Sequence, residues 1–198
     1  LAKKLAVAHP DMPLGQCAPD HPLITHAVVR QVTRRELDAA SAAWHAFTQP
    51  TPQAWFDLLG RDLDALPYLR LAVLNMLAEL PAVGTGLSVT QAWVLERIRR
   101  GDATSRDVLR GLATDSVDAC PSIQQYWELG RTLDHMARGP TPAIAGLAEG
   151  PFSLDMHDDD AHRTRFMASP LSLTELGLAL VEGRDDFLRH DPIHRWWG

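Results

Sequence analysis

Cysteine and lysine are scarce in this chain of 198 residues, and their scarcity excludes several kinds of site. Cys17 and Cys120 are too few for a disulfide framework or a cysteine metal set, so we expect reduced thiols in a cytoplasmic protein. The lysines stand at positions 3 and 4, which leaves no P-loop lysine, Schiff-base lysine or lysine base from Leu5 onward. The motifs G-x-S-x-G, H-E-x-x-H and C-x-x-C are absent, and Gly84-Thr85-Gly86 is too short for a dinucleotide fingerprint and predicts a hinge. The sequence therefore offers no catalytic residue and no cofactor motif.

Long apolar runs are also lacking, since no stretch approaches the roughly 18 residues of a membrane span. The chain is 45% hydrophobic and 22% charged, which is typical of a soluble globular protein without a membrane partner. Its length fits one large domain or two small ones. No signal peptide is visible, but the chain begins at Leu1 rather than Met, which leaves room for a preceding N-terminal part.

Turn signals and one strong helix signal occupy the first 48 residues. Residues 9–22 hold several prolines and predict a loop, and a short helix is expected over Leu23 to Arg30. Thr33-Arg34-Arg35-Glu36 is a capping box, in which the hydroxyl and the carboxylate each satisfy a backbone N–H of the first turn. It predicts a helix to about Phe47, with Trp44 on its apolar, core-facing side.

Two further helices are expected before residue 82. Thr51 as the cap and Pro52 as the first helical residue predict a helix that ends at Gly60 and places Trp55 in the core. The stretch between Pro67 and Pro81 carries one apolar stripe and predicts the next helix. Together these helices predict a small all-helical unit.

Three more helix starts follow the hinge. Ser88-Val89-Thr90-Gln91 is a second capping box, and its helix should stop at Gly101. Thr104 should cap a short helix, and Ser122 a longer one that reaches Ala137. Helices in this order are a familiar beginning of a helix-turn-helix domain.

A β-hairpin and a closing helix are expected after these three helices. Phe152 to Met156 alternates apolar and polar residues, as a half-buried strand does, and Arg165 to Leu173 would be the returning strand. Thr174 then caps a helix that ends at Gly183. The stretch Leu171 to Leu180 reads L-x-L-T-x-x-G-x-x-L and resembles the wing exit of many bacterial winged-helix proteins.

The predicted fold class is therefore mostly α, with a small helical unit followed by a winged-helix-like domain containing one β-hairpin. We expect the helical unit over residues 1–82, of which residues 1–32 could be the tail of a missing N-terminal domain. The winged-helix-like domain is expected over residues 83–198 and ends in an aromatic tail. The fold itself says little about function.

Five stretches carry a second resemblance, which covers most of the chain. They read RRELDAASAAWHAF, LPYLRLAVLNMLAELP, GLSVTQAWVLERI, LSLTELGLALVEG and IHRWWG. The chain thereby resembles the C-terminal two-thirds of a bacterial family, the domain-of-unknown-function family 1835. Its terminal phrase is matched at Ile193, Arg195, Trp196 and Gly198, with His194 in place of an aspartate. The resemblance implies that the family's N-terminal α/β domain is absent here; it implies no activity, since none is established for the family.

DNA binding can be weighed from charge. The candidate contact residues are Arg106, Arg110, Gln124, Gln125 and Arg131, the last three on or near the presumed recognition helix. From residue 84 onward, however, 12 arginines stand against 17 acidic residues, a net charge of −5. Since binding to the phosphate backbone needs positive charge, nucleic acid is a possible but disfavoured partner.

The densest group of titratable side chains is HDDDAH, from His157 to His162. Two imidazoles and three carboxylates could ligate a divalent metal. At the tip of a presumed wing they would lack rigid support, so we favour a mobile, metal-free polar turn.

Three functional hypotheses remain open. The favoured one is a non-catalytic interaction or scaffold module that packs on a preceding domain or on a protein partner. The others are a DNA-binding transcriptional regulator and the rear half of an enzyme whose active site lies in a missing N-terminal α/β domain. Trp196 and Trp197 are candidate partner-binding residues, or alternatively a latch against the helical unit, because two indoles at a chain end rarely stay in water.

Overall fold

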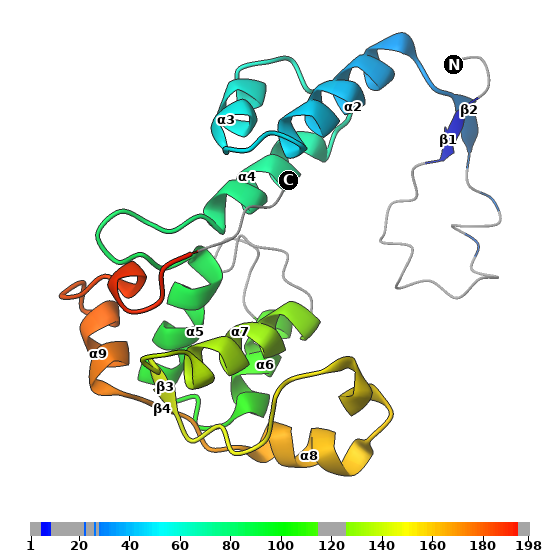
Figure 1. The fold of residues 1–198 in the computed structure, drawn as a ribbon. Coiled ribbons are helices and arrows are strands. Elements are labelled where there is room, and N and C mark those ends of the chain that lie inside the picture. Colours follow the sequence, from blue (N-terminus) through cyan, green and yellow to red (C-terminus); the bar gives the residue numbers. More distant parts are fainter. Residues whose placement is uncertain (1–4, 9–21, 23–25, 27, 115–125, 194–198) are drawn as a thin grey trace. The chain divides into compact units, whose positions relative to one another are not determined.

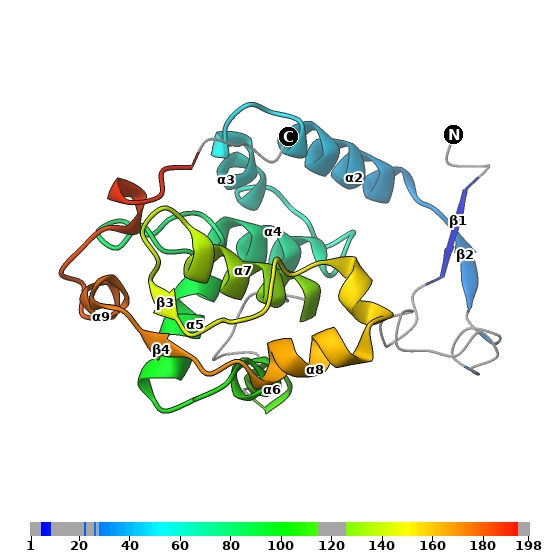
Figure 2. The ribbon, with the colours of Figure 1, turned by 60° about the horizontal axis from the view of Figure 1, so that its bottom comes forward.

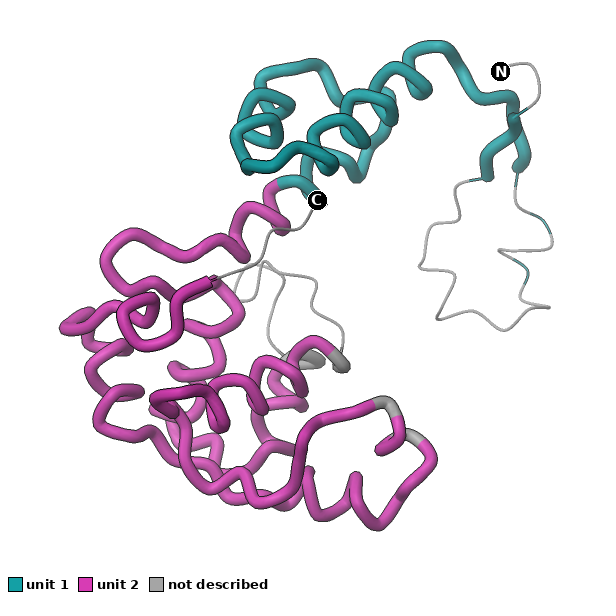
Figure 3. Tube along the Cα trace, in the orientation of Figure 1, with its two compact units in different colours: residues 1–73, 196–198 teal, residues 74–195 magenta. Residues whose placement is uncertain are grey.

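The computed structural model describes residues 5–8, 22, 26, 28–114 and 126–193. It divides into two compact units, which Figure 3 colours separately: unit 1 comprises residues 1–73 with 196–198, and unit 2 comprises residues 74–195. In the described ranges the chain is mostly helical, with two antiparallel sheets of two strands each (Figure 1). The mostly-α prediction is thus confirmed. None of the helices in these ranges combines the length and apolar character needed to cross a bilayer.

Unit 1 begins with a short ribbon that the sequence did not reveal. β1 (Ala6–Ala8) pairs antiparallel with β2 (Val29–Gln31), and Val7 lies opposite Arg30. The helix expected over Leu23 to Arg30 is therefore wrong at its C-terminal end. The β-branched Val29 favours an extended backbone, and pairing with a strand about twenty residues upstream overrides the local helical pattern.

The first predicted helix forms as expected. α2 (Arg34–Phe47) starts with both halves of the capping box: Glu36 N donates to Thr33 Oγ1 at 3.2 Å, and Thr33 N donates to Glu36 Oε2 at 2.7 Å. Trp44, however, is 67% exposed, so its assignment to the core is wrong. Its ring instead stacks at a tilt on Phe47, with the centroids 5.8 Å apart, and shields only part of its surface.

The next two helices of the chain differ from expectation mainly in their caps. α3 (Gln53–Leu59) has Pro52 as its N-cap, so neither Thr51 as cap nor Pro52 as first helical residue is correct. Trp55 is buried, as predicted. α4 (Leu69–Ala78) lies within the predicted third helix, and its side chain Val73 is fully buried.

Unit 2 contains the helices predicted from the later capping signals. α5 (Val89–Arg99) begins with the capping box of Ser88 and Gln91. α6 (Ser105–Thr114) is capped by Thr104, and α7 (Tyr126–Arg138) follows residues 115–125, which lie outside the described ranges. α9 (Glu175–Val181) is capped by Thr174. The cap predicted at Ser122 lies outside the described residues.

The predicted hairpin is wrong in its first strand and at its tip, whereas β4 (Ser172–Leu173) lies at the end of the predicted returning strand. The two strands are β3 (Ile144–Ala145) and β4, with Ile144 opposite Leu173. Between them lie a 3-10 helix, η3 (Leu154–His157), and α8 (Asp160–Ala168), where strands and a wing tip were expected. Figures 1 and 2 show α8 beside α6, and the two helices are in contact.

Burial explains why this segment is helical. Asp159 Oδ1 accepts the His162 N–H at 2.8 Å and caps α8. Phe166 is fully buried, and its ring centroid lies 5.1 Å from that of Phe152. Met156 is also buried, so Phe152 and Met156 enter the core at a spacing of four residues, which a helical turn satisfies as well as a strand does. The His157 to His162 stretch therefore spans the end of η3 and the start of α8, so the wing tip expected there is wrong.

An isolated bridge lies just before β4, outside the two-stranded sheet of unit 2. Thr104 forms an isolated bridge with Pro170, and Leu171 N donates to Ala103 O at 2.9 Å. Helices α5 to α9 and β3 bury their apolar side chains in one cluster. A last 3-10 helix, η4 (Phe187–Arg189), adds Phe187 to this core.

Candidate functional site

The residues that the sequence singled out for nucleic-acid contact lie on two helices. Arg106 and Arg110 are exposed on α6, and Arg131 is exposed on α7. Gln124 and Gln125 lie outside the described residues, as do the partner-binding candidates Trp196 and Trp197.

The arginines at the C-terminal end of α5 are held by carboxylates. Arg97 Nε lies 2.6 Å from Asp102 Oδ2. Glu96 accepts from Arg99 at 2.6 Å and from Arg100 at 2.7 Å. The Arg99 guanidinium, followed by that of Arg100, lowers the pKa of Glu96 to about 2, so this carboxylate stays charged at neutral pH. Two carboxylates therefore offset much of the positive charge of these three arginines.

The exposed face of α7 is likewise of mixed charge. Arg138 Nε lies 2.8 Å from Asp134 Oδ1, and its NH2 donates to Leu147 O at 3.3 Å. A Cβ on Gly150 would lie 2.6 Å from both side chains of this pair, so the loop after β3 packs directly against it. A shallow depression surrounds the pair at the end of α7; it is lined by Arg131, Asp134, His135, Arg138, Gly139 and Pro140.

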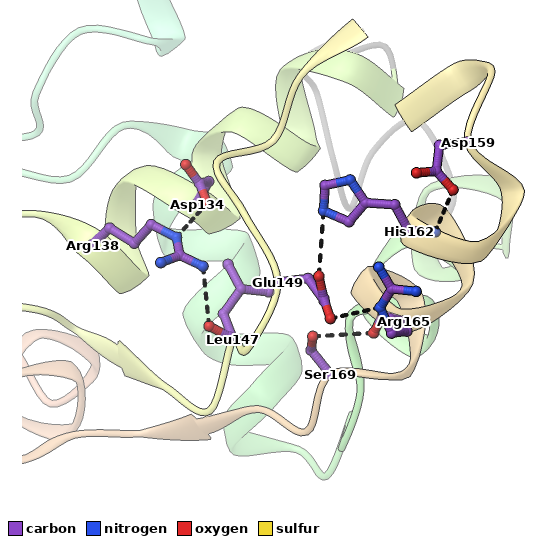
Figure 4. Close-up of polar contacts among 8 residues, drawn as sticks. All are labelled: Asp134, Arg138, Leu147, Glu149, Asp159, His162, Arg165 and Ser169. Carbon is purple, nitrogen blue, oxygen red and sulfur yellow. Dashed lines mark hydrogen bonds and ion pairs between the residues drawn. The ribbon is translucent and has the colours of Figure 1, made fainter. Parts of the chain in front are cut away.

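Glu149 connects the same loop to α8 (Figure 4). Its Oε1 lies 2.8 Å from Arg165 Nε, and its Oε2 lies 3.4 Å from His162 Nε2. Ser169 Oγ donates to the backbone O of Arg165 at 3.3 Å. The backbone N–H of His162, together with nearby charges, lowers the pKa of Asp159 and keeps this helix cap ionised. These contacts fix α8 against the loop and, through Gly150, against α7.

This arrangement is suited to holding elements together. The imidazole of His162 faces a carboxylate, but the nearby hydroxyl of Ser169 bonds to a main-chain carbonyl and is not aligned with the ring for nucleophilic attack. Across the described ranges, no three His, Cys, Asp or Glu side chains are grouped so as to hold a metal ion.

Glu149 and Arg165 were missed from the sequence because their contact joins positions 16 residues apart. Glu149 stands in a Gly/Pro-rich stretch that gives no periodic signal. One available signal was overlooked: Asp159, three residues before His162, is a helix N-cap pattern that predicts α8.

The chain matches no family model, no curated protein and no solved structure. Its function is therefore inferred from geometry.

Proposed function

We propose that this chain is a non-catalytic interaction module, whose winged-helix-like domain recognises a protein rather than DNA. The element order α5, α6, α7, β3, β4 and α9 supports the winged-helix reading. The isolated bridge between Thr104 and Pro170 supports it further, because it places the segment between the first two helices beside the chain that enters β4. In this reading α8 occupies the place of the wing.

The observation that carries the proposal is the charge at the wing position. Asp158, Asp159 and Asp160 are exposed at the start of α8, where a DNA-binding wing would present positive charge to the phosphate backbone. The ion pair of Asp134 and Arg138 leaves the adjoining face of α7 without a strong field of either sign. Mixed charge with few phosphate-binding groups suits a protein partner better than a nucleic acid.

The partner in this proposal is a separate protein or a domain that precedes this segment. The resemblance to the domain-of-unknown-function family 1835 stays a prediction and is compatible with the second case. Glu128 and Arg131 lie on the exposed side of α7 and would contribute complementary charges at the contact. Trp196 and Trp197 remain predicted contributors that the structure does not describe.

Site-specific crosslinking in the native host tests this proposal. A photo-crosslinking amino acid in place of Arg131 should give a discrete protein adduct, and the same group in place of Arg184, an exposed arginine after α9, should not. The adduct should weaken when Glu128 is also changed to Arg, because α7 then presents positive instead of negative charge at position 128.

Crosslinks from position 131 to DNA, with no protein adduct, would replace the proposal with the DNA-binding regulator. Protein adducts of equal yield from positions 131 and 184 would show that α7 does not recognise the partner specifically. They would also contradict the proposal.

A further inference from the structure

Residues 185–191, called the clasp below, contact both the loop before α5 and the end of α7 in unit 2. Phe187 is 3% exposed, and its backbone N donates to Thr85 O at 2.8 Å. Its ring meets that of His135 edge to face, with the centroids 6.4 Å apart. The clasp therefore joins two segments that are distant in sequence: the loop before α5 and the end of α7.

The loop at residues 82–88 is shaped to receive the clasp. Gly86 has a φ of +64°, and a Cβ there would lie 2.8 Å from the backbone N of Leu188 and would collide with Asp186 Oδ1. Asp186 Oδ1 in turn accepts the Leu188 N–H at 3.0 Å. A glycine is thus required both by conformation and by the close approach of the clasp. The predicted hinge is held in place by this packing.

Two histidine–aspartate contacts secure the clasp at its ends. His135 Nε2 lies 2.7 Å from Asp191 Oδ2, and His190 Nε2 lies 2.9 Å from Asp185 Oδ2. The side chains of Asp191 and Asp185 are 17% and 28% exposed, so both carboxylates are partly withdrawn from water. The backbone N–H of Asp186 and then the His190 side chain lower the pKa of Asp185, which keeps that carboxylate ionised.

We propose that the clasp is a pH-responsive closure, tightened when His135 and His190 are protonated. An imidazole attracts a carboxylate as an ion only when it carries a proton, and histidine gains that proton between about pH 8 and pH 5. The added attraction is present at the acidic end of this range and is lost as the pH rises.

The charges around each imidazole allow this response. On α7, Arg131 and Arg138 lie one turn from His135 on either side, and Asp134 is its neighbour in the chain. Arg138 is paired with Asp134, and Asp191 is the carboxylate in direct contact with the ring.

The surroundings of His190 are supplied by the clasp itself and by the end of α9. Arg189 is its neighbour in the chain and also acts on Asp185. Arg184 is paired with Glu182, so that pair adds little net charge. The loop at residues 82–88 contributes no titratable side chain. Asp185 is thus the carboxylate in direct contact with His190.

Amide hydrogen exchange on the full chain tests the proposal between about pH 5.5 and pH 8. The reporters are the N–H groups of Phe187 and Asp191, which bond to Thr85 O and Phe187 O. Their protection factors, corrected for intrinsic exchange, should rise about 5-fold on acidification, as expected for two partly exposed ion pairs. Amides of α5 should not follow the same change.

The double variant His135→Asn with His190→Asn should lose the pH response, because neither amide takes up a proton. His162→Gln is the matched control, because its imidazole also faces a carboxylate but on α8; it should leave the clasp response unchanged. If the double variant does not fold, Asp191→Asn alone decides, and it should reduce the response to about 2-fold. A flat profile in the unaltered chain would overturn the proposal. A full response in the double variant or in Asp191→Asn would overturn it as well.

Discussion

Unit 2 buries side chains from α5 through α9 in one apolar cluster, whereas unit 1 buries few and exposes several large ones. The buried hydrophobic residues described in unit 1 are Ala46, Trp55, Leu58, Leu63 and Val73. Trp44 and Phe56 are 67% and 50% exposed. Burial of apolar surface is the main favourable term in folding, so the two units should differ in stability.

Unit 1 has a compact polar network beside its small core. Glu36 there accepts from Arg30 at 2.5 and 2.9 Å and from the N–H and hydroxyl of Thr33 at 2.7 and 2.8 Å. This network ties the ribbon to the start of α2. The comparison teaches that unit 2 is held by packing between distant segments, whereas unit 1 has a smaller buried core to hold it.

The largest loss of stability is expected when a large buried side chain is removed from the core of unit 2. Phe166→Ala should lower the free energy of unfolding by about 3–5 kcal/mol, since the fully buried ring leaves a cavity beside Phe152. Leu178→Ala on α9, where the side chain is 43% exposed, should change it by about 0.5 kcal/mol or less. Urea denaturation compares the two; similar losses would mean that α8 does not belong to the core.

A smaller loss of stability is expected from a core substitution in unit 1, together with a loss of amide protection over two helices. Leu58→Ala should cost about 2–4 kcal/mol, because Leu58 is 2% exposed and has few buried neighbours to close the gap. Hydrogen exchange should show protection lost across α2 and α3 while α5 to α9 keep theirs. A simultaneous loss of amide protection in both units would contradict the expectation that the two units differ in stability.

Equivalent helix caps in the two units give a matched pair. Thr33→Ala and Thr174→Ala should each cost about 1 kcal/mol, because each hydroxyl accepts a backbone N–H of the first turn. The two costs should be similar, because each hydroxyl also donates at 2.8 Å, that of Thr33 to Glu36 Oε2 and that of Thr174 to Pro142 O. Thermal melts of the two variants compare these costs, and a loss of stability in only one variant would contradict the prediction.

The acid response of unit 1 should be the subtlest effect. Hydrogen bonds from Arg30, then from Thr33, hold the pKa of Glu36 well below its usual range. A lowered folded-state pKa stabilises the fold above the unfolded value, about 4.3, and this stabilisation is lost as the pH falls toward the folded value. Protection of α2 should therefore fall between about pH 5 and pH 3.

Glu36→Gln should remove this dependence, whereas Asp38→Asn, at an exposed ion pair with Arg34, should preserve it. An unaltered acid response in Glu36→Gln would assign the effect to another carboxyl group.

The elements predicted correctly from the sequence are helices whose first turn is marked by a local capping residue. The capping boxes at Thr33 and Ser88 and the cap at Thr174 each lie within four residues of the groups they satisfy. Such contacts depend on the helix alone, so a single sequence is enough to read them.

The errors fall where distant segments decide the outcome. β1 and β2 pair across about twenty residues, and β3 and β4 across about thirty. The alternation from Phe152 to Met156 fitted a strand, but Phe166 and Phe152 draw the segment into the core as helical turns. The contacts of Glu149 depend on that packing, so they could not be predicted from the sequence.

The most direct test of the central claim is a titration of the full chain against labelled, pooled random DNA duplexes at about 150 mM salt, followed by selection of bound sequences. The acidic start of α8 and the paired charges of α7 predict no saturable binding and no recovered motif. Saturation near 10⁻⁸ M or below, about the usual range of specific binders, with a motif lost in Arg131→Ala, would contradict the account and make this domain a DNA-binding regulator.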